Sequence, residues 1–418
     1  MEKRKERILL CLCHMSGNEM KYVQEAFDAN WVVPLGPNVN GFEKDLEEFV
    51  GQNKRVVALS AGTAAVHLGL LACEVGLGDE VLVQSFTFCA SSHPITYLGA
   101  TPVFIDSEKD TWNIDPELLE EAIKDRIAKT GKKPKAIVPV ALYGMPYQID
   151  RIMGIANKYG IPVVEDAAEG FGSKFNGQVL GTFGKYGVLS FNGNKMITTS
   201  GGGALVTAND DEWREIMMYA TQYRESYPYY QHEKIGYNYR MSNICAGIGR
   251  GQMTIVNDHI AHHKKVQKLY EELLKDVKGV TVHSQPATGE YDSNYWLCTM
   301  TIDPDVKVKG QENAYKQLIT GAVGGAAGVI HSAASAVTNC QPNDNVEAMR
   351  MGLDALNIES RPLWKPMHKQ PVYKNAPAYV NGVSEALFKV GMCLPAGPYV
   401  TEDDVRFIVE AIKSLIVE

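Results

Sequence analysis

The sequence predicts an α/β protein with a mostly parallel central sheet in a large domain, followed by a smaller α+β C-terminal domain. Short, almost continuously apolar segments alternate with helical patterns between residues 56 and 207. Strands of this kind are typical of parallel sheets, because helices cover both faces of such sheets. A length of 418 residues with 45% hydrophobic residues also suffices for a sizeable core in two domains. The predicted strands are Val56–Leu59, Val81–Val83, Pro102–Ile105, Ala136–Ala141, Pro162–Glu165, Gly187–Phe191 and Ala204–Thr207.

Helical patterns and changes in composition define the expected domain organisation. Residues 1–15 are predicted to be an N-terminal extension, residues 16–274 the large domain and residues 275–418 the small domain. A stretch rich in Ala and Gly, near residues 309–338, reads as an insertion in the small domain. Its pattern fits either a close-packed helix pair or an extra loop. The predicted helices include Asn18–Ala29, Gly41–Val50, Ala64–Val75, Gln148–Tyr159, one long helix from Asn243 to about Leu274, and Thr401–Ile416.

The composition argues against several classes of partner. A formal net charge of -8 gives no basic field for nucleic-acid phosphates, so we expect no nucleic-acid partner. The apolar run Ile8–Cys13 is too short for a signal peptide, and no run is long enough to span a bilayer. The eight cysteines are scattered, and Cys11 and Cys13 are too close for a zinc pair. We therefore expect a cytoplasmic protein with reduced thiols, no membrane partner and no metal site.

Lys195 is the most informative residue of the chain. It ends the string SFNGNK (residues 190–195), in which a short apolar strand runs into a turn of Gly and Asn, and a glycine run follows at 201–203. A lysine in such a turn can reach into a cleft, where its amine is available for a Schiff base. The alternative is a surface lysine, which is the usual fate of this residue type.

An acidic residue and a strand-to-helix turn complete the pattern. Asp166 ends the apolar string PVVED (162–166), at the carboxyl end of a strand, where parallel sheets place their sites. A buried carboxylate there can pair with a protonated ring nitrogen, or it can simply cap the following turn. In the string SAGTA (60–64), Gly62 permits close backbone approach, and the N–H groups of the next helix can bind a phosphate.

Phe88, in the string SFTF (85–88), fits either a ring-stacking position or the core. With an amine, an acid and a phosphate cradle, the chain provides what a protein needs to hold pyridoxal 5′-phosphate (PLP). This cofactor then acts as the electron sink for the chemistry.

The order of these motifs resembles that of the DegT/DnrJ/EryC1/StrS family of PLP-dependent nucleotide-sugar aminotransferases. The resemblance extends from about Met15 to the C-terminus and implies the fold-type-I architecture of PLP-dependent transferases. The strings that carry it are GTAA (62–65), VEDAAE (164–169), SFNGNK (190–195), GYNYRMS (236–242) and RPLWKPMH (361–368).

The resemblance implies a role at the cofactor for several residues. Lys195 would form the Schiff base, Asp166 would pair with the pyridine nitrogen, and Phe88 would stack on the ring. Glu169 would contact the 3-oxygen of the cofactor, at a position where the family often has Gln or His.

At the phosphate end, the resemblance assigns Gly62, Thr63 and Ser190 to the phosphate of the chain's own cofactor. Asn238 would reach the phosphate of the other subunit's cofactor, so the active form would be a homodimer with shared sites. For Asn238 alone, the alternative is an N-cap of the following helix.

Two strings, from Phe191 to Ala204 and from Trp364 to His368, look most like one branch of the family. That branch aminates UDP-linked 4-keto-6-deoxy sugars that carry an N-acetyl group, on the way to bacillosamine-type sugars of surface glycans. The resemblance therefore implies transfer of an amino group from glutamate to the 4-keto position, which gives a 4-amino sugar.

Arg361, Lys365 and His368 would then form a cationic rim for the nucleotide diphosphate, with solvated loop charges as the alternative reading. Two other functions stay open at this point. One is a PLP-dependent deoxysugar dehydratase, whose relatives replace the Schiff-base lysine with His, and the other is a PLP-binding regulatory protein without turnover.

Overall fold

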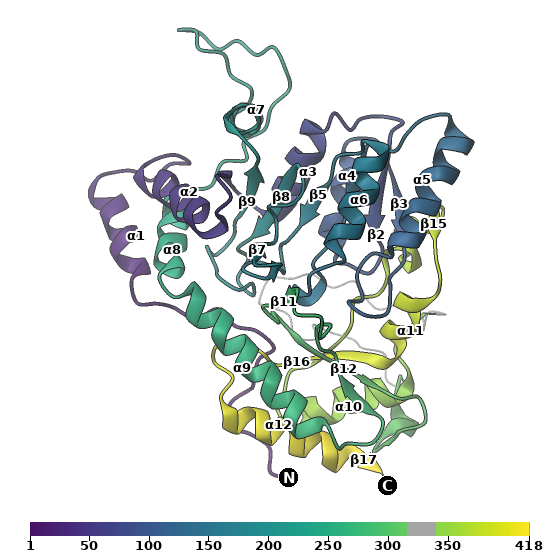
Figure 1. The fold of residues 1–418 in the computed structure, drawn as a ribbon. Coiled ribbons are helices and arrows are strands. Elements are labelled where there is room, and N and C mark those ends of the chain that lie inside the picture. Colours follow the sequence, from purple (N-terminus) through teal and green to yellow (C-terminus); the bar gives the residue numbers. More distant parts are fainter. Residues whose placement is uncertain (316–339, 418) are drawn as a thin grey trace.

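The computed structural model describes residues 1–315 and 340–417. A large α/β part and a smaller part lie at opposite ends of the molecule, with the long helix α9 along one side (Figure 1). From residue 316 on, the Ala/Gly-rich insertion predicted near 309–338 lies outside the described residues.

The predicted strands form one continuous sheet in the large part. Their order is β1-β9-β8-β5 in one half and β4-β2-β3-β15 in the other. Parallel bridges between Ile137 and Val163 and between Val140 and Asp166 join the two halves. Only β9 runs antiparallel to its neighbours, so the predicted mostly parallel sheet is confirmed. The strands are β1 (Arg55–Leu59), β2 (Glu80–Gln84), β3 (Thr101–Ile105), β4 (Ala136–Val138), β5 (Val164–Asp166), β8 (Tyr186–Ser190), β9 (Gly203–Thr207) and β15 (Ala378–Tyr379).

Helices cover both faces of this sheet, which explains why its strands are apolar along their whole length. In β1, Val56 and Ala58 pack on one side, whereas Val57 and Leu59 pack on the other. The first face is covered by α2 (Pro37–Val50), α5 (Pro116–Thr130) and α6 (Ile149–Tyr159), and the second by α3 (Gly62–Ala72), α4 (His93–Tyr97) and α7 (Asp210–Ala220). Beside α2 lie α1 (Glu19–Asp28) and α8 (Asn243–Met253).

The predicted single helix from Asn243 to about Leu274 is wrong. The structure has two helices, α8 and α9 (Val256–Leu274), separated at Thr254 and Ile255. The N–H groups of these two residues bond three positions back, to Gly251 and Gln252, and the Thr254 hydroxyl also donates to the Gly251 carbonyl at 2.6 Å. Two adjacent β-branched residues with a competing hydroxyl thus tighten the last turn and end α8.

The smaller part is built around an antiparallel sheet with the order β10-β12-β16-β14. The N-terminal segment lies against it, because Ile8 bridges to Ile358 and the Leu10 carbonyl accepts the Ala396 N–H. This sheet comprises β10 (Val280–Val282), β12 (Cys298–Ile302), β16 (Gly391–Leu394) and β14 (Arg361–Pro362), and α9, α10 (Asp344–Ala355), α11 (Val383–Val390) and α12 (Glu402–Leu415) pack around it. Shorter pairings involve β6 (Lys174–Phe175), β7 (Gln178–Val179), β11 (Tyr291–Asp292), β13 (Lys307–Val308) and β17 (Ile416–Val417).

In the part of the chain that the structure describes, no helix is both long and apolar enough to cross a membrane. Across the same residues, no group of three or more His, Cys, Asp or Glu side chains is placed to hold a metal ion.

His263 of α9 is a fully buried histidine, with none of its surface exposed. Its Nδ1–H donates to the Tyr295 carbonyl at 3.1 Å, whereas its Nε2 has no partner. Burial lowers the pKa of His263 from 6.5 to about 3. Between these values the unfolded chain binds a proton that the folded chain does not bind, so stability is lost as the pH falls from 6.5 toward 3.

Replacing His263 with Asn removes this titration, and the Asn side chain can still donate to Tyr295. Between pH 7 and pH 5 we expect the wild-type protein to lose about 2 kcal/mol more unfolding free energy than His263→Asn. Urea unfolding at both pH values measures the difference, with the exposed His232→Asn as control. Equal losses for wild type and His263→Asn would show that His263 titrates normally in the folded state.

Candidate active site

Most of the predicted cofactor residues line one cavity of about 340 Å³ at the carboxyl ends of β5 and β8. This is the edge at which parallel sheets usually carry their sites. The lining includes Gly62, Thr63, Phe88, Asp166, Glu169, Ser190 and Lys195. These residues come from four separate segments of the sequence and meet in one place, as the motif order indicated.

Lys195 is directed into this cavity. Its N–H donates to the Asn192 carbonyl at 2.9 Å, which closes the small-residue turn after β8. Its side chain is 14% exposed, and its Nζ lies 3.3 Å from Glu169 Oε1 and 3.9 Å from the centroid of the Trp296 ring. The alternative of a surface lysine is therefore wrong.

Asp166 is buried at the end of β5. Its Oδ2 accepts the Ser91 hydroxyl at 2.6 Å, and its Oδ1 accepts the Ala168 N–H at 3.1 Å. Burial raises the pKa of Asp166, against the lowering effect of these hydrogen bonds and of Lys195. The carboxylate therefore caps its turn and also faces a cavity in which a cationic partner would stabilise its ionised form.

Glu169 is the second buried carboxylate of the cavity, and burial raises its pKa too. Its Oε2 accepts the Tyr143 N–H at 2.7 Å, while its other oxygen faces Lys195. Tyr143 donates from a left-handed backbone conformation with φ of 54°, which is uncommon for a bulky residue. The backbone is thus shaped to hold the Glu169 carboxylate beside the lysine.

The opposite end of the cavity fits a phosphate. Gly62 begins α3, and the first N–H groups of a helix have no partner within it. A Cβ on Gly62 would lie 3.0 Å from the Ser190 Cβ, and one on Gly203 would lie only 2.4 Å from the Gly62 nitrogen. Glycine at both positions lets this helix end approach β8 and β9, where the Ser190 side chain also faces the cavity.

Phe88 lies at the cavity wall and is not a core residue. Its side chain is 51% exposed, and its ring lies 5.5 Å from that of Trp364, which also lines the cavity. An exposed aromatic face beside the two buried carboxylates is suited to stacking on a planar ring.

Asn238 lies outside this cavity, in an adjacent pocket of about 370 Å³ that shares Ser60 and Gly201 with it. Ser242 is the residue that caps α8, because its hydroxyl accepts the Ile244 N–H at 3.3 Å. The alternative of Asn238 as the N-cap is therefore wrong.

Arg361, Lys365 and His368 are not among the residues that line the cavity, although Trp364 between them is. Arg361 forms an ion pair with Glu359 at 3.0 Å. His368 Nδ1 lies 2.6 Å from the Ser85 hydroxyl, and burial lowers the pKa of His368. The segment borders the cavity through Trp364, and the side chains of Arg361 and His368 bond to other residues of the fold.

Three residues of the site were not predicted from the sequence. Ser91 follows β2, whose carboxyl end faces the same edge as that of β5, and this position was its only signal. Tyr143 contributes a backbone N–H and Trp296 an indole ring, and neither role has a signature in the sequence.

A largely buried lysine beside two buried carboxylates, with a helix N-terminus across the cavity of a mostly parallel sheet, is the arrangement expected of a PLP-dependent enzyme of fold type I. Residues 14–327 and 311–413 match the DegT/DnrJ/EryC1/StrS aminotransferase family, and the chain belongs to this family. It is therefore a PLP-dependent sugar aminotransferase, and the dehydratase and regulatory alternatives are set aside.

Individual relatives match the chain over nearly its full length. It is 41% identical to EpsN of Bacillus subtilis (strain 168), which is assigned as a PLP-dependent aminotransferase, over 98% of this chain and 96% of EpsN. It is 33% identical to the GDP-perosamine synthase of Caulobacter vibrioides, over 98% and 99% of the two chains. The crystal structure of a family aminotransferase from Brucella abortus superposes with a TM-score of 0.80 at 28% identity, covering 95% of each chain.

Replacing Asp166 with Asn keeps the shape of the side chain and removes its charge. We expect the rate of the half-reaction with the amino donor to fall about a hundredfold or more, as when a key electrostatic partner is lost, with a smaller effect on PLP binding. Stopped-flow single-turnover absorbance measures the rate, and PLP titration measures the affinity. Asp115→Asn, at the N-cap of α5, is the matched control. An unchanged single-turnover rate would contradict the role of Asp166.

Proposed function

We propose that this enzyme transfers an amino group from glutamate to the 4-keto position of a UDP-linked 6-deoxy N-acetyl sugar. The product is a 4-amino sugar for surface-glycan synthesis, and the enzyme acts as a cytoplasmic homodimer with shared active sites. The observation that carries the proposal is the Lys195 amine, which lies 3.3 Å from Glu169 in a cavity that also holds Asp166 and the N-terminus of α3.

The residues around the cavity fit PLP. Gly62, Thr63 and Ser190 would hold its phosphate at the start of α3, and Phe88 would pack on its ring. Asp166 would pair with the ring nitrogen, since a buried carboxylate whose pKa is raised gains most from a cationic partner. When bound, PLP supplies the electron sink that makes a proton on the amino-acid α carbon removable.

Lys195 would carry that proton. Its Nζ would take the proton from the α carbon of glutamate and would then release it on the cofactor side of the reacting atoms. In the second half-reaction it would move a proton in the reverse sense, onto the sugar carbon that bore the ketone. Glu169 would keep the protonated amine in place between the two transfers, because its Oε1 faces Nζ inside a buried site.

For the sugar nucleotide, the proposal rests on the segment Arg361–His368. Trp364 lines the cavity, so this segment borders the space that the substrate would enter. Arg361 and Lys365 would contribute charge for the diphosphate, and His368 would contribute through its contact with Ser85. The choice of UDP follows the sequence resemblance, whereas a relative at 33% identity is named for a GDP sugar.

A substrate screen tests the proposal directly. We expect kcat/KM for a UDP-linked 4-keto-6-deoxy N-acetyl sugar to exceed that for GDP- or dTDP-linked 4-keto sugars by about tenfold or more. A tenfold preference corresponds to about 1.4 kcal/mol in transition-state binding. Products are identified by NMR and 2-oxoglutarate release is followed in parallel. Preference for a GDP-linked sugar would overturn the nucleotide assignment, and a 3-amino product would overturn the 4-keto assignment.

The shared site predicts complementation between subunits. Lys195→Ala should be inactive, and Asn238→Asp should bind PLP weakly, because it places a like charge near the partner's phosphate. In a mixed dimer, one site carries both changes and the other carries neither. After subunit exchange of equal amounts, we expect activity to recover to about a quarter of wild type, as random pairing of two chains requires.

Subunit exchange is verified with differently tagged chains, and a mixture of Lys195→Ala with wild type is the control for pairing statistics. If exchange is complete and the mixture of the two variants stays as inactive as its parents, Asn238 acts within its own chain or has no role at the cofactor.

A further inference from the structure

Trp296 contacts both Lys195 and the residue before it. Its Nε1–H donates to the carbonyl of Asn194, the residue just before Lys195, at 2.7 Å. Its ring face lies under the lysine amine, with 3.9 Å between Nζ and the ring centroid. The indole, which is only 2% exposed, therefore connects the backbone at the start of the lysine to the charged end of its side chain.

The backbone that carries the indole is fixed in turn by Asn294. Asn294 Oδ1 accepts the backbone N–H of Trp296 at 2.8 Å, and Asn294 Nδ2 donates to the backbone carbonyls of Glu169 and Phe171, both at 2.9 Å. Trp296 is thus tied to the same turn that presents Glu169. The lysine amine lies against the Glu169 carboxylate and the Trp296 indole, and one buried asparagine, Asn294, bonds the backbone of both residues.

This arrangement restricts a side chain that is normally free. A lysine has several rotatable bonds, and holding its amine at one point costs conformational entropy. The face of an indole carries negative electrostatic potential and attracts an ammonium, most strongly when water is excluded. Because its Nε1–H is bonded to the Asn194 carbonyl, the Trp296 ring does not move when the lysine amine moves. The ring therefore offers the amine a binding position that is fixed relative to the backbone.

We propose that Trp296 is a positioning residue for Lys195, which holds the amine ready for proton transfer whenever it is not bonded to the cofactor. The inference rests on the proposed role of Lys195 as the proton carrier. It assigns a function to an indole that comes from the strand-to-loop segment before β12, far from Lys195 in the sequence.

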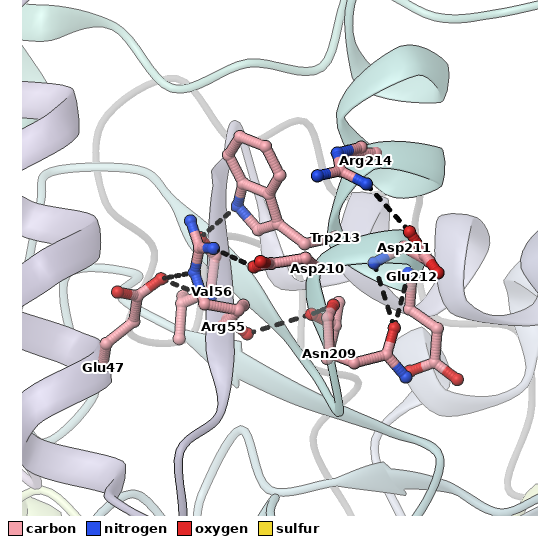
Figure 2. Close-up of polar contacts among 10 residues, drawn as sticks. Glu47, Arg55, Val56, Asn209, Asp210, Asp211, Glu212, Trp213 and Arg214 are labelled. Carbon is pink, nitrogen blue, oxygen red and sulfur yellow. Dashed lines mark hydrogen bonds and ion pairs between the residues drawn. The ribbon is translucent and has the colours of Figure 1, made fainter.

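A similar arrangement of an indole, a cation and a backbone carbonyl occurs once more in the described residues, away from the cavity, and provides a control. Figure 2 shows Trp213 with its Nε1–H donating to the Val56 carbonyl at 3.2 Å. The guanidinium of Arg55, the residue just before Val56, lies over the Trp213 ring at 4.7 Å. This cation is also bound by Glu47 and Asp210, so there the arrangement fastens α7 to β1.

The first test uses the cofactor-free enzyme. Lys195 is labelled with a trace amount of acetic anhydride at fixed pH, and its rate relative to an exposed lysine is read by mass spectrometry. We expect labelling to rise about two- to fivefold in Trp296→Leu, as the loss of one cation–π contact allows, and by less in Trp296→Phe, which keeps a ring face. Trp213→Phe should label Lys195 at the wild-type rate.

The second test uses the PLP-loaded enzyme and α-deuterated glutamate. We expect Trp296→Phe and Trp296→Leu to lower the single-turnover rate and raise its deuterium isotope effect, with the KM for glutamate within about twofold of wild type, because only the proton-transfer step is affected. A loss of general packing would leave the isotope effect unchanged.

Wild-type labelling of Lys195 in both variants, or an unchanged isotope effect, would overturn the role of Trp296. Should Trp296→Leu fail to fold, Trp296→Phe decides alone. A wild-type enzyme that turns over no glutamate would overturn the proposed function. If the wild type is active but the Trp296 variants match it in labelling and isotope effect, only this inference is overturned.

Discussion

The burial of two carboxylates, Asp166 at the end of β5 and Glu169 three residues later, is the constraint around which the site is organised. Burial raises the pKa of both, so their ionised forms depend on donors and cations supplied nearby. The Ser91 hydroxyl and the Ala168 N–H donate hydrogen bonds to Asp166. The Tyr143 N–H and the Lys195 amine donate to Glu169. Among the described residues, no lysine lies at hydrogen-bond distance from Asp166, so its carboxylate is suited to pair with a cationic cofactor ring.

Much of this arrangement was predictable because it follows from local patterns. Apolar strands such as those ending at Leu59, Asp166 and Ser190 predict a parallel sheet, and the functional sites of such a sheet lie at the carboxyl ends of its strands. The small residues around Gly62 and Lys195 likewise indicate where a helix end and a side chain approach a ligand closely. Motif order then joined these local signals into one cavity.

The rest could not be predicted, because it depends on contacts between distant segments. Trp296 contacts Lys195 in a fold where Asn294 hydrogen-bonds the backbone of both Trp296 and Glu169. The break between α8 and α9 depends on one hydroxyl at Thr254, in a segment whose pattern is helical on both sides. The residues of the Arg361–His368 segment occur in a motif, yet their partners, Glu359 and Ser85, were visible only in the fold.

The central claim is that Lys195 is the amine that bonds to the cofactor and moves the proton. The most direct measurement is borohydride reduction of the PLP-loaded enzyme, followed by proteolysis and mass spectrometry of the lysine-containing peptides. A phosphopyridoxyl group on Lys195 alone is the predicted result, and prior addition of excess glutamate should abolish it by freeing the lysine. A modification at another lysine, or none at Lys195, would contradict the account.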